Sequence, residues 1–184
     1  MKRTLISLTL GLFVVTTIWS QTTYITLTGG YALANLEESD TNANGFRING
    51  LFEYNPNDGV LSHGFSIGYI GTTANSSNGQ QLEYKLNNVP MYYAPKFTFG
   101  SGNFKPFVKG ALGMHFSSYK RISNLAEFKD NDVGFYGGAS VGAMFFISDE
   151  FYINLDYEWA YLSNSYYSNG FMNTFNLGVG YDFW

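Results

Sequence analysis

The fold is decided by a nine-residue stretch, which reads Ile153-Asn154-Leu155-Asp156-Tyr157-Glu158-Trp159-Ala160-Tyr161. Large apolar or aromatic side chains occupy every odd position, and small or polar side chains occupy every even position. Successive side chains of a β-strand point to opposite faces, so this period of two predicts a strand. An amphipathic helix would instead repeat its apolar positions every three to four residues. The stretch therefore predicts a strand that separates two different environments.

Seven other segments alternate in the same way, at residues 24–35, 45–54, 60–71, 84–99, 105–116, 134–146 and 174–184. Short turns join some of these segments, at residues 55–59, 100–103 and 148–150. Longer polar connections separate the others, at residues 36–44, 72–83, 117–133 and 162–173. Bacterial transmembrane barrels alternate short periplasmic turns with longer extracellular loops in this manner. The pattern predicts an all-β fold, an eight-stranded antiparallel up-and-down transmembrane β-barrel.

Two prolines interrupt the segment at residues 84–99. Pro90 and Pro95 each lack the N–H group that a strand donates to its neighbour. We therefore expect a bulge or irregular pairing in this strand.

The first 20 residues have the pattern of a secretory signal peptide. Lys2 and Arg3 precede an apolar stretch at residues 5–18, and residues 18–20 fit a cleavage site before Gln21. We expect residues 1–20 to be removed on export and residues 21–184 to form one outer membrane β-barrel domain. Loss of Lys2 and Arg3 would change the formal net charge from −4 to about −6.

Composition excludes several classes of function. An acidic chain without a basic stripe is unsuited to nucleic acid, and a chain with no cysteine has no disulfide framework, thiol nucleophile or thiolate metal site. Charged residues are only 13% and aromatic residues 19%, which favours a surface facing lipid. After the leader, no apolar run approaches the ~20 residues of a membrane-spanning helix. A soluble sandwich or lipocalin-like barrel also alternates, but aromatic residues at the strand ends favour the girdles of a membrane barrel.

Residues near the carboxyl end carry a family resemblance. Tyr181 and Phe183 end an alternating run that resembles the C-terminal insertion signal of outer membrane barrels, and Trp184 follows one residue beyond the usual end. Residues 105–113 and the glycine-rich residues 137–142 resemble the small porin-like, OmpA-type outer membrane β-barrel family, notably its Bacteroidota branch.

This resemblance implies an integral protein of the cell outer membrane. Its implied partners are outer membrane lipid and lipopolysaccharide, and the assembly machinery during insertion. The family includes structural anchors, adhesins and proteins of unknown role, so the resemblance itself says little about activity. We expect no enzymatic activity and no cofactor.

Strand parity places seven charged residues on the lumen face, namely Arg47, Glu53, Lys96, Lys109, Asp156, Glu158 and Asp182. A buried charge is costly unless it is paired, so three cations and four anions predict an internal salt-bridge network. Eight strands also leave an interior only just wide enough for side chains. We expect a lumen plugged by polar side chains. The alternative is a narrow, weakly selective porin-like channel for small solutes.

A lipid A-modifying hydrolase is a third hypothesis. His115-Phe116-Ser117 has the His-x-Ser spacing of one family of barrel deacylases, in which Ser117 would be the nucleophile, His115 its base and a carboxylate such as Glu127 the orienting group. Parity places His115 and Ser117 towards the lumen, away from lipid, and Ser118 departs from the Ser-Asn pattern of that family. We therefore expect no catalytic residues.

No metal site is expected either. His63 and His115 fall on different strands and opposite faces, with no cysteine to join them. Glu37, Glu38 and Asp40 offer hard oxygen ligands but lack the spacing of a calcium loop.

The extracellular loops are therefore the expected place of function, because binding residues concentrate on loops carried by a rigid scaffold. The candidate contact residues are Tyr119, Arg121, Phe128, Tyr166 and Tyr167. Exposed aromatic side chains are favoured in recognition surfaces. The hypothesis is a structural or interaction/adhesion role through these loops, with an unidentified protein partner. The alternative is that the aromatic residues pack on the barrel rim or meet lipopolysaccharide headgroups.

Overall fold

The structure is a computed structural model that describes residues 22–37, 41–56, 59–76, 82–123 and 127–183. Residues 1–20, where we expect a signal peptide, and Trp184 lie outside the described residues. The described chain folds into eight strands, which are β1 (Thr22–Leu36), β2 (Thr41–Asn55), β3 (Leu61–Ser76), β4 (Leu82–Thr98), β5 (Phe104–Ile122), β6 (Glu127–Phe146), β7 (Phe151–Leu162) and β8 (Tyr167–Phe183). Within these ranges, no helix is long and apolar enough to cross a membrane.

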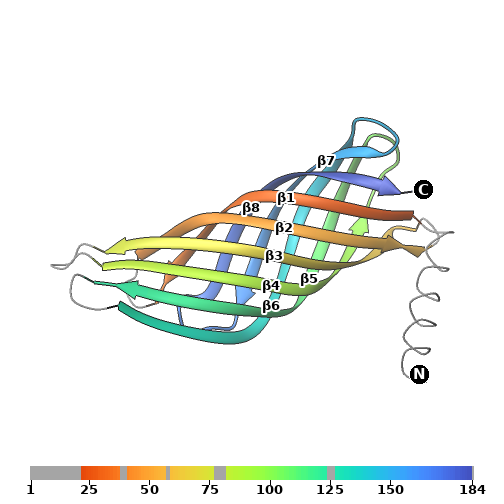
Figure 1. Ribbon diagram of the computed structural model, residues 1–184. Coiled ribbons are helices and arrows are strands. Elements are labelled where there is room, and N and C mark those ends of the chain that lie inside the picture. The colour runs from red at the N-terminus through yellow and green to blue at the C-terminus, as the bar shows by residue number, and fades with distance from the viewer. Residues whose placement is uncertain (1–21, 38–40, 57–58, 77–81, 124–126, 184) are drawn as a thin grey trace, which may run out of the picture.

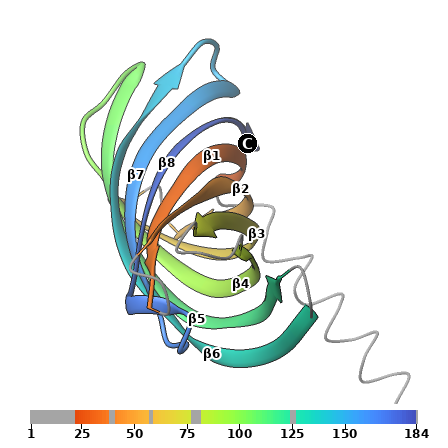
Figure 2. The ribbon, with the colours of Figure 1, turned by 90° about the vertical axis from the view of Figure 1, so that its left-hand side faces the viewer.

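The strands form one closed antiparallel barrel. Each strand pairs with its neighbour in sequence, and β1 pairs with β8 to close the ring. The strands run obliquely around the barrel (Figures 1 and 2). The predicted eight-stranded up-and-down barrel is confirmed. We call the end that carries Thr22 and Phe183 the terminal end, and the opposite end the distal end.

The strands at the distal end are longer than the sequence predicts. The ladder between β5 and β6 continues from the pair Phe116 and Val133 to the pair Ile122 and Glu127, so most of the expected loop at residues 117–133 is a paired hairpin. The same correction applies to the expected loops at residues 36–44, 72–83 and 162–173, which the neighbouring strands largely occupy. The alternation is inverted there, because the outer face of the wall becomes polar while apolar side chains fill the interior.

The outer face is apolar along the middle of the barrel and polar at its distal end. Aromatic pairs on this face include Phe46 with Tyr69 and Tyr157 with Phe175 on the distal side of the apolar band. Towards the terminal end, Phe104 packs on Phe145. Beyond the distal aromatic residues, the exposed outward side chains include Asn35, Asn42, Asn44, Thr73, Asn75, Asn87, Ser118, Lys129 and Asn131.

The interior is filled in three layers. A small aromatic cluster at the terminal end contains Tyr24, Phe107, Met144 and Tyr152. Charged side chains occupy the middle layer. A larger apolar cluster fills the distal part, and its large members include Leu36, Ile70, Tyr84, Leu86, Tyr119, Tyr136, Leu162, Tyr167 and Met172. This distal apolar layer differs from the polar interior that strand parity predicts.

Two backbone irregularities interrupt the regular ladders. The pairing of β4 omits Val89 and Pro90 on its β3 side and Ala94 and Pro95 on its β5 side, while the register before and after each gap is the same. Between β1 and β8, the register shifts between Ala34 and Leu36. The extra residues of β8 form a bulge, in which Asn169 and Gly170 have φ angles of 55° and 69°.

Candidate functional site

The middle layer is organised around Arg47, which extends inward from β2. Its Nη1 atom lies 2.7 Å from Glu158 Oε1 on β7, and the exposed fraction of each side chain is 1%. Nη1 also donates to Tyr136 OH at 3.1 Å, and Nη2 donates to Tyr92 OH at 2.8 Å. The two tyrosine rings stack at a centroid distance of 4.9 Å, and Tyr136 OH donates to Glu158. Side chains from β4, β6 and β7 therefore hold the guanidinium group of Arg47 in place.

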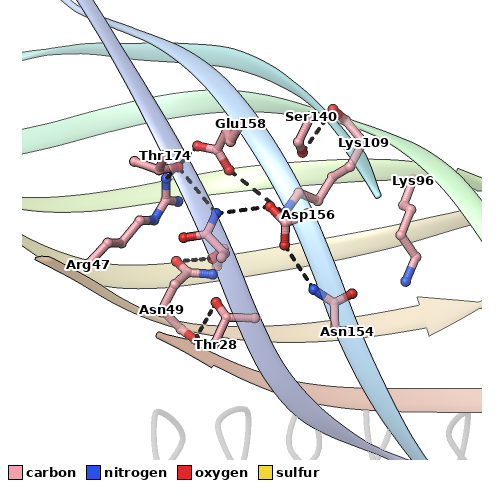
Figure 3. A network of polar contacts seen from close by, with 12 residues as sticks. Thr28, Arg47, Asn49, Lys96, Lys109, Ser140, Asn154, Asp156, Glu158 and Thr174 are labelled. Carbon is pink, nitrogen blue, oxygen red and sulfur yellow. Dashed lines mark hydrogen bonds and ion pairs between the residues drawn. The ribbon is translucent and has the colours of Figure 1, made fainter. Parts of the chain in front are cut away.

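Lys109 on β5 extends this group towards the terminal end. Its Nζ atom lies 3.8 Å from Glu158 Oε2 and 4.0 Å from Asp156 Oδ1. Asp156 also accepts hydrogen bonds from the amides of Asn154 and Asn176, at 2.8 and 2.9 Å. Figure 3 shows Lys109 reaching from its strand towards Asp156 and Glu158, with Lys96 lying apart from them.

Lys96 forms a second buried ion pair. Its Nζ atom lies 2.7 Å from each carboxylate oxygen of Glu53, and Ser62 Oγ donates to Glu53 at 3.0 Å. The ammonium group also lies 5.5 Å from the ring centre of Tyr24 and 5.2 Å from that of Phe107. Attraction of a cation to these ring faces adds to the carboxylate interaction.

The structure thus brings six of the seven expected lumen charges into two ionic groups. Asp182, the seventh, lies at the terminal end, where it lines a cavity of about 310 Å³ together with Lys105. Sequence reasoning missed Tyr92 and Tyr136 as members of the network, although their parity places both rings on the inner face. Between the two ionic groups, a cavity of about 10 Å³ lined by Lys96, Lys109 and Asp156 has room for about one water molecule.

A chain of neutral polar groups lies further towards the distal end. His115 Nδ1 lies 2.8 Å from Ser117 Oγ, which donates to Asn88 Oδ1 at 2.6 Å. The Asn88 amide donates to Tyr167 OH at 2.9 Å, and Tyr167 OH lies 2.9 Å from Thr72 Oγ1. All five side chains are buried. These contacts satisfy polar groups in the interior of the barrel.

The structure does not assemble the triad of the hydrolase hypothesis. His115 and Ser117 are together, but both side chains are enclosed inside the barrel, away from lipid. Glu127 instead lies at the hairpin tip, where its carboxylate pairs with Lys120 at 3.0 Å and with Lys129 at 3.1 Å. Their hydrogen bonds lower the pKa of Glu127.

The expected loop residues are divided between the interior and the surface. Tyr119 and Tyr167 are buried inside the barrel, with exposed fractions of 6% and 2%, which differs from the loop placement that we expected. Arg121 and Tyr166 are partly exposed, and Phe128 is exposed. The positions of Tyr119, Arg121 and Phe128 follow from the extended β5–β6 hairpin, because strand alternation continues through residues 117–122 and 127–133.

The distal aromatic residues form one connected cluster. Tyr119 stacks on Tyr166 at a centroid distance of 4.7 Å and contacts Phe128 edge-on at 6.4 Å. Arg121 lies 5.8 Å from the centre of the Phe128 ring. Partial burial and the hydrogen bond to Asp130 raise the pKa of Tyr166 to about 12. The hairpin tip is therefore supported by rings that pack beneath it.

At the terminal end, Tyr181 and Phe183 contact each other edge-on at 4.6 Å, and Tyr181 also contacts Phe151. Phe183 is exposed on the outer face. Among the described residues, no three histidine, aspartate or glutamate side chains come close enough to hold a metal ion.

The closed wall, apolar outer band and filled interior agree with the result of a family comparison. Residues 5–183 match the model of a family described as the outer membrane protein beta-barrel domain. The chain belongs to this family. This outer membrane β-barrel is accordingly an integral outer membrane protein that sits in lipid.

Solved structures of outer membrane proteins share the fold of this β-barrel. Neisserial surface protein A is 15% identical with a TM-score of 0.62, and the match covers 88% of this chain and 97% of that one. Ail, the attachment invasion locus protein of Yersinia pestis, is 18% identical with a TM-score of 0.57 over 89% of this chain and 99% of that one. A major outer membrane protein from Thermus thermophilus is 10% identical with a TM-score of 0.59, over 88% and 99% of the two chains. No curated protein sequence matches the barrel significantly.

Proposed function

We propose that the protein is a non-conducting scaffold whose extracellular hairpins carry an interaction or adhesion surface. The observation that carries the first part is the middle layer, where the two buried ionic groups enclose a cavity of about 10 Å³. The distal apolar layer lies beyond it and includes Leu86, Leu162 and Met172. A conducting path needs continuous water, so these layers favour a plugged lumen over a channel.

The β5–β6 hairpin is the proposed interaction surface. Its strands of 19 and 20 residues are the longest of the barrel. Phe128 contacts the buried ring of Tyr119 edge-on, and the guanidinium group of Arg121 lies over the Phe128 ring. Side chains held in place before binding lose less conformational entropy when a partner docks. The exposed ring and the guanidinium group are also residue types that dominate binding energy at protein interfaces.

The charges of this hairpin favour a protein partner over a polyanion. Ail has been solved in complex with the heparin analogue sucrose octasulfate. Near the tip of this hairpin, three basic residues are balanced by three acidic ones, namely Lys120, Arg121 and Lys129 by Glu127, Asp130 and Asp132. A surface with equal numbers of positive and negative charges has no net attraction for a polyanion. We therefore do not propose a heparin-like ligand for this chain.

Lipid contacts and membrane insertion complete the proposal. Lipopolysaccharide would meet the outward side chains at the distal end of the wall. The assembly machinery would recognise Tyr181 and Phe183 during insertion, together with Trp184 outside the described residues.

The closed lumen predicts the absence of channels. The refolded protein, identified by a gel mobility that changes on boiling, is expected to produce no discrete current steps in planar lipid bilayers. The same folded preparation must be used in both measurements, with a general porin as the positive control. Reproducible steps from the folded protein would replace this proposal with a narrow, weakly selective channel.

The adhesive surface predicts a loss of binding in the variant Arg121→Ala/Phe128→Ala. Cells that display the wild-type barrel are expected to adhere more strongly than empty cells to at least one surface of a panel coated with different proteins. The variant is expected to adhere about tenfold less, because aromatic and arginine side chains dominate the binding energy at protein interfaces. Ser118→Ala, an outward position on the same hairpin, is the matched control. Equal adhesion of variant and wild type at equal surface amounts would exclude this hairpin, and no adhesion above empty cells would refute the adhesive role.

A further inference from the structure

A hollow of about 550 Å³ lies on the outer face of the wall, where β1, β2 and β8 meet at the distal end. We call it the asparagine hollow, because its polar lining consists of Ser168 and five asparagines, Asn35, Asn42, Asn44, Asn169 and Asn173. Its volume is within the range of about 300–1,000 Å³ that is usual for ligand pockets. The hollow is separate from the β5–β6 hairpin and does not depend on the function proposed above.

The bulge in β8 builds one wall of this hollow. The register of β8 against β1 shifts between Ala34 and Leu36, so residues 168–171 of β8 have no pairing partner on β1. Asn169 has a φ angle of 55°, which asparagine tolerates better than most residues. Gly170 has a φ angle of 69°, and a Cβ atom there would lie 2.7 Å from the carbonyl oxygen of Leu162. The backbone geometry therefore specifies glycine at this point and fixes the shape of the wall.

The amides of the hollow are available to a ligand. Asn173 Oδ1 accepts a hydrogen bond from Tyr157 OH. In the part of the chain that the structure describes, no other side-chain hydrogen bond involves a lining asparagine. Asn35, Asn42 and Asn44 are exposed. Each amide offers two donors and an acceptor oxygen, which matches a ligand whose hydroxyl groups both donate and accept.

The lining also defines the charge of the ligand. It contains no lysine, arginine, histidine, aspartate or glutamate, whereas sites for phosphate or carboxylate groups ordinarily supply cationic donors. Leu33 and Phe171 add a partly exposed apolar edge, and the Phe171 ring stacks on Trp159 at a centroid distance of 4.8 Å. Carbohydrates fit this combination, because they are neutral and rich in hydroxyl groups and their ring faces are less polar.

The height of the hollow places it at the edge of the lipid. Tyr31 pairs with Phe46 and Phe175 in the distal aromatic band. Two residues further along the strand, about 7 Å, Leu33 pairs with Asn44 and Asn173 in the hollow. Aromatic bands mark the interface between hydrocarbon and headgroups. We propose that the asparagine hollow binds a neutral carbohydrate, presented either by a glycolipid of the outer leaflet or as a free saccharide.

The test compares the barrel with the variant Asn35→Ala/Asn42→Ala/Asn44→Ala in phosphatidylcholine nanodiscs that contain the neutral glycolipid digalactosyldiacylglycerol. Native mass spectrometry measures the fraction of barrels that retain the glycolipid. We expect the triple variant to retain it at least tenfold more weakly than the wild type. The matched control Asn75→Ala/Asn131→Ala removes exposed asparagines elsewhere on the wall and should leave retention unchanged.

A second arm adds soluble digalactosylglycerol to barrels in nanodiscs without glycolipid. Binding in both arms supports the carbohydrate site and adds the free saccharide as a source, whereas binding in the nanodisc arm alone assigns the site to the lipid. If the triple variant does not fold, the single variant Asn42→Ala should still weaken binding about threefold. Equal binding by variants and wild type, no binding in either arm, or a preference for the anionic glycolipid sulfoquinovosyldiacylglycerol would overturn the proposal.

Discussion

Replacement of Glu158 by leucine is expected to lower the free energy of unfolding by about 3–5 kcal/mol, because it leaves a buried cation without its partner. Arg47 Nη1 lies 2.7 Å from this carboxylate, and both side chains have an exposed fraction of 1%. Lys109, 3.8 Å from the same carboxylate, would retain only the more distant Asp156. Urea titration of the barrel in lipid vesicles, followed by tryptophan fluorescence, would measure the loss.

Two further variants separate the ion pair from simple loss of packing. Arg47→Met is expected to cost less than Glu158→Leu, because Glu158 keeps Tyr136 and Lys109 as partners. The double variant Arg47→Met/Glu158→Leu should be more stable than Glu158→Leu alone, since it leaves no unpaired arginine. A double variant whose loss equals the sum of the two single losses would show that the pair is not coupled.

Alanine at Gly45 is expected to have the other large effect, a cost of about 3 kcal/mol or more. Gly45 lies on the inner face of β2, and a Cβ atom there would lie 1.8 Å from the carbonyl oxygen of Gly71 and 2.8 Å from the Cα atom of Thr72. These are backbone atoms of β3, so no side chain can move aside. The two strands would have to separate, and the fraction of protein that gives the folded, heat-modifiable band should fall sharply.

Gly50→Ala on the same strand is the matched control. A Cβ atom at Gly50 would meet nothing closer than the carbonyl oxygen of Ile67 at 3.9 Å. This variant should fold like the wild type, and the smaller freedom of its unfolded chain adds slight stability where the backbone conformation is compatible. Equal refolding of Gly45→Ala and Gly50→Ala would contradict the close approach of β2 and β3.

The membrane-spanning part of the fold is predictable from the sequence because one physical rule governs it. Where lipid lies outside and packed polar groups lie inside, side chains such as Tyr157 and Glu158 must alternate. This rule gives the strands and the inward direction of Arg47. It fails at the distal end, where Tyr119 points inward to an apolar layer and Ser118 points outward to polar surroundings. At this end, apolar side chains point inward and polar side chains point outward. In the sequence, the outward polar residues look like those of a loop.

Strand parity shows which face of the wall a side chain lies on, but not its position along the barrel axis. The ionic partners could therefore not be predicted from parity. Arg47 and Glu158 meet across the barrel although 111 residues separate them, and Lys96 pairs with Glu53 on another strand. These matches depend on the relative shift of all the strands around the ring. That shift is a property of barrel closure and is not encoded in any single strand. The asparagine hollow was missed for a similar reason, since it arises from a register shift between β1 and β8.

The change of polarity along the wall fixes how deeply the molecule sits in the bilayer. Along β1 and β2, the outer wall is apolar below the pair Leu33 with Asn44 and polar above it, at Asn35 and Asn42. The core inside changes in the opposite sense. Sinking by one residue pair would bring the exposed amides of Asn42 and Asn44 into hydrocarbon, and rising would bring rings such as Phe46 into water. Both displacements are opposed, so the barrel has one preferred depth. The β5–β6 tip is thereby held at a set distance above the lipid surface.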